Sequence, residues 1–219
     1  MDRTEYMRSF AAHVSHELKS PLTAIRGSAE LMRDEGEDMT PAERRKFLDN
    51  ILQDTDRLTR LVARLRELAQ AEMPIVPGAT SLAETLGRLR SRFGGLDIRL
   101  VGEDVVVPLP AETFDIVFGH LFDNSLQHGA TRITLATVRE EQGLGFTVAD
   151  NGAGISEANR ARIFEPFFTT RRDAGGTGMG LDIVRALLRA QHADITLESG
   201  EGGTTFLIIA RDGQGGPVV

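Results

Sequence analysis

The sequence predicts an α-helical hairpin domain, able to form a four-helix bundle on dimerisation, followed by an α+β two-layer sandwich. Apolar residues repeat every three or four positions up to about residue 70, as in the seam of a helical bundle. Two prolines and a glycine then fall within residues 73–78, and only after them do glycines and β-branched runs become frequent. We therefore expect a helical domain over 1–72, a linker over 73–78, an α+β domain over 79–212 and a flexible tail over 213–219.

The first domain is predicted to be two long helices joined by a polar turn at residues 35–38. The second helix begins with Thr40-Pro41-Ala42-Glu43, which combines an N-cap threonine, a first-turn proline and a capping-box glutamate. The apolar stripes consist of Phe10, Val14, Leu18, Leu22 and Ile25 in the first helix and of Leu48, Ile51, Leu52, Thr55, Leu58, Leu61, Val62, Leu65 and Leu68 in the second. Two helices alone cannot shield both stripes from water, so we expect two hairpins to pair in a homodimer.

The second domain mixes helices with strands. Helical periodicity predicts helices over residues 82–93, 114–122 and 181–192. Alternation and β-branched runs predict strands over 97–101, 105–109, 131–139, 145–149, 194–198 and 204–210. Short glycine-containing turns join two pairs of these strands as hairpins, so we expect a mixed sheet with the helices on one face.

Composition excludes several classes of function. The net charge of −7 argues against binding to nucleic acid or to anionic lipid. The chain has no cysteine, which excludes disulfides, thiolate metal sites and cysteine nucleophiles. No apolar run approaches the roughly 20 residues of a membrane-spanning helix, and the N-terminus lacks a signal-peptide pattern. We therefore expect a soluble, cytoplasmic chain, either complete or the cytosolic part of a longer membrane-bound protein.

One histidine of the first helix is placed to react, in the run His16-Glu17-Leu18-Lys19-Ser20-Pro21-Leu22. On a helix, His16 lies roughly 160° away from Val14 and from Leu18, so it faces solvent if the apolar stripe is buried. A neutral imidazole is a nucleophile near neutral pH, and Glu17 is adjacent to orient or deprotonate it. Pro21 has no backbone N–H, so we expect the helix to bend there. The alternative is an ordinary surface histidine, which is how we interpret His13.

Four segments of the second domain carry groups suited to a nucleotide. They are His120–His128 on a helix, Asp150-Asn151-Gly152-Ala153-Gly154-Ile155 after a strand, Phe164–Arg172, and Gly175–Leu181 at the start of a helix. The carboxylate of Asp150 can accept the exocyclic amine of adenine, and glycine-rich helix starts bind phosphate through backbone N–H groups. Taken singly, the first three have alternative interpretations: a polar helix end, a turn, and a core aromatic beside a solvated basic pair. The fourth is neither a P-loop nor a Rossmann fingerprint, because it lacks Gly-Lys-[Ser/Thr] and a preceding strand.

The run that starts at His16 resembles the phosphoacceptor box of the histidine kinases. The four segments, in their order and spacing, resemble the ATP-binding domain (the Bergerat fold) shared by histidine kinases, type II topoisomerases, Hsp90-like chaperones and mismatch-repair ATPases, over most of residues 81–211. The resemblance implies ATP as the phosphoryl donor, Mg²⁺ on Asn124, and Thr205 as a support for Asp150. The nucleotide contacts that it implies are Asn124, Gln127, His128, Asp150, Gly152, Gly154, Ile155, Phe168, Thr170, Arg171, Arg172, Gly176, Thr177, Gly178, Met179, Gly180, Leu181 and Thr205.

Two residues of the nucleotide segments depart from the family pattern, and Ser20 stands where Thr or Asn is usual in the phosphoacceptor box. His120 stands where kinases usually carry asparagine and the ATP-hydrolysing relatives carry a glutamate base, and Gln127 stands where Lys or Arg is common. The missing glutamate suits a kinase, while the missing cation removes a phosphate contact.

The resemblance implies autophosphorylation of His16, transfer of the phosphoryl group to an aspartate of a response regulator, and a phosphatase activity that would use Ser20. Two other functions compete: a non-catalytic phosphotransfer scaffold, and an ATPase machine. The intact glycine segments oppose the first, and the histidine at position 120 opposes the second.

Overall fold

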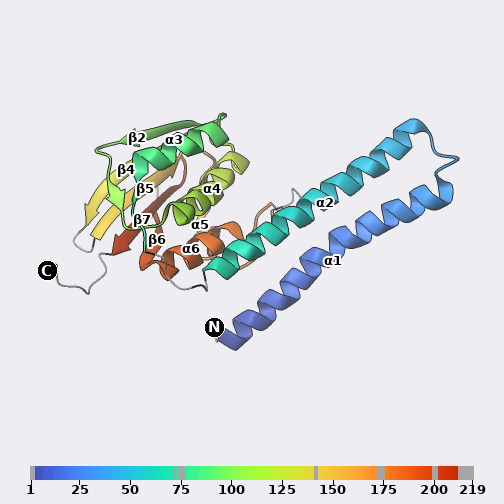
Figure 1. The fold of residues 1–219 in the computed structure, drawn as a ribbon, viewed down its shortest axis with the longest axis horizontal. Coiled ribbons are helices and arrows are strands. Elements are labelled where there is room, and N and C mark those ends of the chain that lie inside the picture. The colour runs from blue at the N-terminus through green and yellow to red at the C-terminus, as the bar shows by residue number, and fades with distance from the viewer. Residues whose placement is uncertain are drawn as a thin grey trace. The chain divides into compact units, whose positions relative to one another are not determined.

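The computed structural model describes residues 3–71, 73, 77–140, 143–171, 176–198 and 202–211. The chain forms two compact units, Met1–Arg66 together with Pro166–Gly178, and Glu67–Glu165 together with Met179–Val219. Figure 1 shows a helical hairpin in the first unit and a layered arrangement of helices and strands in the second. Among the described residues, no helix is both long and apolar enough to cross a membrane.

The hairpin consists of helix α1, Arg3–Glu35, and helix α2, Pro41–Gln70. The predicted capping box at the start of α2 is confirmed: Glu43 Oε2 accepts hydrogen bonds from the hydroxyl and the backbone N–H of Thr40 at 2.7 and 2.8 Å, and Glu43 N–H donates to Thr40 Oγ1 at 3.3 Å. The hydroxyl of Thr40, followed by its N–H, holds the pKa of the Glu43 carboxyl below its usual value. Helix α1 continues through Pro21 without a break, and the bend expected there stays a prediction.

Both helices of the hairpin keep an apolar face in water. Of their described hydrophobic side chains, Leu61 alone is buried, at 1% exposure. The large apolar side chains that remain exposed are Leu22 (53%), Leu31 (43%), Leu48 (49%), Leu52 (63%) and Val62 (59%). A single hairpin therefore leaves its apolar stripes largely uncovered, as the sequence predicts.

The second unit is built on a mixed sheet. Its strands are β2 Asp97–Val101, β4 Arg132–Glu140, β5 Gly143–Asp150, β6 Ala193–Glu198 and β7 Thr205–Arg211. They follow the order β2-β4-β5-β7-β6, in which β2 and β4 are parallel and the other pairs are antiparallel. The central strand, β5, therefore ends at Asp150, one of the predicted nucleotide contacts.

Three helices cover one face of this sheet: α3 Leu82–Arg92, α4 Ala111–Gln127 and α6 Gly180–Ala190 (Figure 1). A further short helix, α5, covers Glu157–Arg160. Along α4, Phe114, Phe118 and Phe122 recur one turn apart and are buried, at 1% exposure or less. The rings of Phe114 and Phe118 lie 5.8 and 5.7 Å from that of Phe146 on β5, a distance at which aromatic pairs attract. The predicted fold class is therefore confirmed.

The structure corrects one predicted strand. Residues 105–109 form only a two-residue strand, β3 Val106–Val107, which pairs with β1, Thr80–Ser81, outside the main sheet. The reason is that Pro108 and Pro110 follow directly, and a proline cannot donate to a strand ladder. Residues 141–142 of the predicted turn, residues 172–175 before the glycine cluster, and the chain from residue 212 onward lie outside the described residues.

Candidate functional site

His16 lies on the solvent-facing side of α1, with 78% of its side chain exposed. This exposure agrees with the helical geometry, which turns the imidazole away from the apolar stripe. Ser20, one helical turn later, is also exposed. The imidazole is therefore open to a reactant that approaches from solvent.

Glu17 is held by a residue that the sequence did not point to. Its Oε1 lies 4.0 Å from His16 Nδ1, while its Oε2 accepts a hydrogen bond from Arg57 Nη2 of helix α2 at 2.9 Å. Glu17 is only 8% exposed, so the guanidinium supplies the countercharge that a carboxylate needs in this setting. Arg57 thereby restrains the carboxylate beside His16.

The segment Pro166–Gly178 belongs to the same compact unit as the hairpin. Phe167 is 5% exposed, and its ring stacks on that of His13 with 4.7 Å between centroids and 10° between planes. It also lies 5.6 Å from the ring of Phe10. His13 is exposed, as the sequence predicts for a surface histidine, and its ring in addition packs on an aromatic residue of the third nucleotide segment.

The backbone of this segment is fixed at two points. Phe167 has φ 63°, in the left-handed region that non-glycine residues rarely adopt. Thr177 is buried and accepts a hydrogen bond from Arg64 of α2. A Cβ at Gly178, where φ is 69°, would collide with the backbone of Phe167. The two ends of the segment therefore lie against each other.

The predicted phosphate contacts of the segment are only partly described. Arg171 is half-buried, its backbone N–H donates to Thr169 Oγ1 at 3.1 Å, and its carbonyl accepts from Gly176 N–H at 3.0 Å. Phe168 is half-buried and Thr170 is exposed. Arg172 lies outside the described residues.

In the second unit, Asp150 is held by three donors. Ser125 Oγ donates to Oδ2 at 2.9 Å, and the backbone N–H groups of Gly152 and Thr204 donate to Oδ1 at 2.9 and 3.1 Å. None of these donors is the predicted Thr205, whose backbone instead pairs with that of Ala149 in the sheet. These three hydrogen bonds fix the carboxylate in one orientation, and the structure shows no fourth donor to it among the described residues.

Glycines surround this carboxylate because there is no room for side chains. A Cβ at Gly203, where φ is 150°, would overlap the carbonyl oxygen of Asp150, and one at Gly152 would lie 3.0 Å from the carbonyl oxygen of His128. Gly154 has φ 74°, and Ile155 beside it is half-buried. The loop after β5 is therefore pressed against the end of α4 without side chains between them.

The end of α4 carries the remaining polar residues of the predicted site. Asn124 and His128 are half-buried and Gln127 is exposed. The carbonyl of His128 accepts a hydrogen bond from Ala153 N–H at 3.1 Å, which ties the helix end to the loop after β5. This contact brings the first and second predicted segments together within one unit.

The start of α6 offers backbone donors. Met179 is buried, and no side chain caps the helix at this residue. Gly180 and Leu181 then form the first turn, in which the backbone N–H groups have no partner inside the helix. Such a helix start attracts anions through these groups and through the helix dipole.

Two family models match the chain. The model of the His Kinase A (phospho-acceptor) domain matches residues 6–74, and that of the histidine kinase-, DNA gyrase B- and HSP90-like ATPase matches residues 111–213. The probable sensor histidine kinase TcrY of Mycobacterium tuberculosis is 35% identical over 216 residues, which are 92% of this chain and 45% of that protein. The chain therefore spans about half the length of this relative.

Two solved structures share the fold. The Acinetobacter baumannii histidine kinase AdeS superposes with a TM-score of 0.69 at 21% identity, covering 90% of this chain and 98% of that one. The histidine kinase ThkA, in its complex with the response regulator protein TrrA, superposes with a TM-score of 0.72 at 24% identity, covering 96% of this chain and 63% of that one. At these sequence identities, the two structures support the fold of this chain and no conclusion about its activity.

Proposed function

This chain belongs to the histidine kinases of two-component systems, and we propose that it is an ATP-dependent protein-histidine kinase that phosphorylates its own His16. One observation carries the proposal. A chain matched by a phospho-acceptor model has a histidine with 78% of its side chain in solvent, inside the helix that this model covers. In the ATPase-like part of the same chain, three hydrogen bonds fix the carboxylate of Asp150, which can accept the exocyclic amine of adenine.

Asp150 is our candidate for adenine recognition. Its three donors fix the carboxylate before any ligand arrives, so little orientation entropy is lost on binding. A carboxylate accepts the exocyclic amine of adenine, whereas guanine presents a carbonyl oxygen at the same place. We therefore expect ATP to be preferred over GTP.

The phosphates would lie at the start of α6, where Gly180 and Leu181 expose backbone N–H groups. Asn124 is our candidate ligand for Mg²⁺, which prefers oxygen and binds nucleotides through few protein ligands and the substrate phosphates. A half-buried amide oxygen on a helix fits that role. When bound, Mg²⁺ would neutralise charge on the triphosphate.

His16 would attack the γ-phosphorus through Nε2. The carboxylate of Glu17 lies nearer to Nδ1, so the neutral tautomer with the proton on Nδ1 leaves the lone pair of Nε2 free. The N–P bond forms as the bond from γ-phosphorus to the bridging oxygen breaks, ADP leaves, and Glu17 stabilises the Nδ1 proton. Arg57 keeps Glu17 in place through this step.

We further propose that the chain works as a homodimer and passes its phosphoryl group to a response regulator. The exposed apolar faces of α1 and α2 support the dimer, because a second hairpin would cover them. The relative ThkA is described in a complex with a response regulator protein. Ser20 is exposed one turn after His16, where its hydroxyl would position water for dephosphorylation of that partner.

The test is incubation with γ-labelled ATP and Mg²⁺. We expect label that is lost in acid and stable in base, absent in His16→Ala and retained in the matched control His192→Asn, an exposed histidine of the other unit. Absence of label in the wild type would refute the kinase and favour a scaffold. Steady release of phosphate without label would favour an ATPase.

A further inference from the structure

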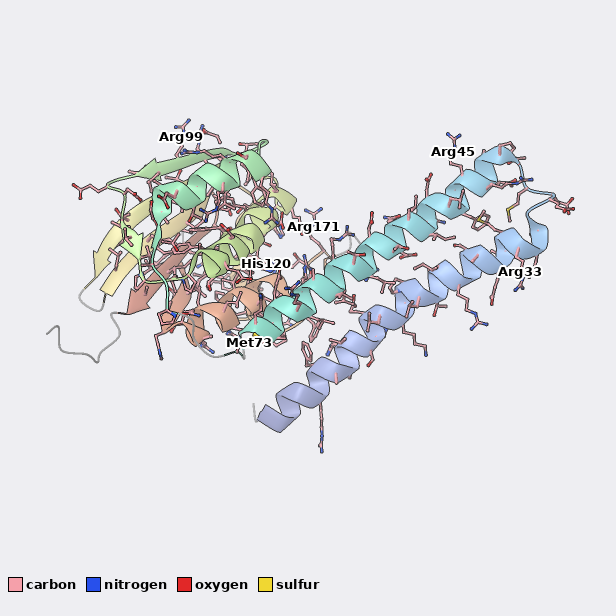
Figure 2. The ribbon with its side chains drawn as sticks, viewed as in Figure 1. Arg33, Arg45, Met73, Arg99, His120 and Arg171 are labelled. Carbon is pink, nitrogen blue, oxygen red and sulfur yellow. The ribbon has the colours of Figure 1, made fainter. Side chains whose placement is uncertain are left out.

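His120, on helix α4 (Figure 2), is one of the two residues of the nucleotide segments that depart from the family pattern, and it is nearly buried. The side chain of His120 is only 9% exposed, and its Nε2 lies 2.7 Å from Oε2 of Glu67, in the last part of helix α2. The side chain of Glu67 is 26% exposed. Both residues belong to the same compact unit. The hydrogen bond is short and largely withdrawn from solvent, so it is stronger than a hydrogen bond between exposed side chains.

The other side of the imidazole faces the glycine turn. A Cβ placed on Gly180 would lie 3.5 Å from His120 Nδ1 and 3.9 Å from its Cβ and Cγ, so the ring packs directly on this glycine. Gly180 is the first residue of α6, whose exposed N–H groups are the proposed phosphate contacts. Along α4, Asn124 follows His120 by four residues and so lies on the same side of the helix. The imidazole thus touches one proposed phosphate contact and neighbours the proposed Mg²⁺ ligand.

We propose that Glu67 is a positioning residue for phosphoryl transfer, which it serves by orienting the imidazole of His120 against the glycine turn at the phosphate end of the nucleotide site. This role presupposes the kinase activity proposed for the chain. Glu67 accepts the Nε2 proton, which fixes both the rotamer and the tautomer of the ring. The fixed ring then supports the backbone of Gly180, and through it the first turn of α6.

The consequence is kinetic. A site that holds the triphosphate slightly out of line loses rate much more than affinity, because the reacting atoms must lie close to the geometry of attack. Adenine recognition by Asp150 does not involve Glu67, so most of the nucleotide affinity remains when Glu67 is changed.

The experiment compares Glu67→Gln, His120→Ala and the double variant in the full chain, with Glu112→Gln as the matched control. Glu112 also accepts a side-chain hydrogen bond from the end of α2, from Gln70 Nε2 at 2.9 Å, and lies in the first turn of α4, eight residues before His120. For Glu67→Gln we expect the rate of His16 labelling at saturating ATP to fall about tenfold, the size of one lost charge-assisted hydrogen bond. We expect the KM for ATP to change less than about twofold and the control to match the wild type.

The double variant separates positioning from general damage. If Glu67 acts through His120, the double variant labels His16 at the rate of His120→Ala alone, whereas independent effects would multiply. Stoichiometric ADP binding by each variant corrects for any loss of folded protein. Imidazole ¹⁵N chemical shifts report the tautomer of each histidine, which a loss of packing alone would not change. Glu67→Gln should change these shifts for His120 and leave those of His192 unchanged.

Multiplied effects, or an unchanged rate in Glu67→Gln, would overturn this role while the wild type still labels. Failure of the wild type to label His16 would instead overturn the kinase proposal itself. The two failures are therefore distinguishable in the same experiment.

Discussion

Replacing Ser125 by alanine tests how the adenine-binding aspartate is held. Ser125 is 4% exposed, and its hydroxyl is the one described donor to Oδ2 of Asp150, at 2.9 Å. A hydrogen bond to a charged group contributes about 1.5–3 kcal/mol. The hydroxyl has a single proton and also lies 3.0 Å from the carbonyl oxygen of Leu121, so the lower end of that range applies.

In Ser125→Ala, Oδ2 of Asp150 loses this donor, so the carboxylate is less restrained. Binding of adenine must then restore the orientation of the carboxylate. The cost is at most the energy of the lost bond, about 1.5 kcal/mol, or about tenfold in Kd for ATP. Oδ1 keeps its two backbone donors from Gly152 and Thr204, so the site is weakened and not abolished. The labelling rate of His16 at saturating ATP should stay within about twofold, because the phosphate end is unchanged.

Isothermal titration with ATP measures this effect, and Thr205→Ala is the matched control. The family pattern points to Thr205 as the support, while the hydrogen bonds come from Ser125, Gly152 and Thr204. We therefore expect Thr205→Ala to change Kd less than about twofold. A larger loss in Thr205→Ala than in Ser125→Ala would refute this assignment of the hydrogen bonds, and so would an unchanged Kd in Ser125→Ala.

Three more outcomes are expected. Arg57→Ala leaves the nearly buried Glu17 without its guanidinium, so unfolding in urea should show a loss of about 1–3 kcal/mol and labelling should slow, while Arg57→Lys should recover part of both. Gly203→Ala places a methyl group on the carbonyl of Asp150, so its melting temperature should fall by several degrees (~2 kcal/mol), and an unchanged value would contradict the close approach. The Glu43 carboxyl has a lowered pKa in the folded state, so its contribution is present above its unfolded pKa and is lost as the pH falls through the folded pKa; a stability profile against pH should flatten in this acid range in Glu43→Gln.

Local patterns in the sequence predicted the elements and the exposed nucleophile. The strand Asp97–Val101 has the predicted bounds, and the capping box at Thr40 and Glu43 forms as expected, because both depend on residues that are neighbours in sequence. The exposure of His16 follows from helical geometry alone. The difference at residues 105–109 is also local, because Pro108 and Pro110 shorten the strand that the run of valines predicts.

The partners that hold the functional residues could not be predicted in the same way. Arg57 lies 40 residues from Glu17, Glu67 lies 53 residues from His120, and Ser125 lies 25 residues from Asp150. No periodicity links such positions, because their contacts depend on how helices pack and on where the loops return to them. The stacking of His13 on Phe167 belongs to the same class. A single sequence therefore identifies groups that react and an adjacent group such as Glu17, and misses the orienting groups that lie far away along the chain.

Helix α4 carries residues that stabilise the fold and residues that belong to the proposed site on different faces. Phe118 and Phe122 lie one turn apart and are fully buried toward the sheet. His120 and Asn124 are also one turn apart, but each is offset from the phenylalanines by two residues, or about 200° around the helix. Ser125 lies on the same face as the phenylalanines, seven residues after Phe118, and reaches the strand end through its hydroxyl. Changes in the phenylalanine row should therefore lower the free energy of unfolding, whereas changes in the polar row should alter binding or rate in a protein that still folds, and a polar-row variant that merely unfolds would contradict this division.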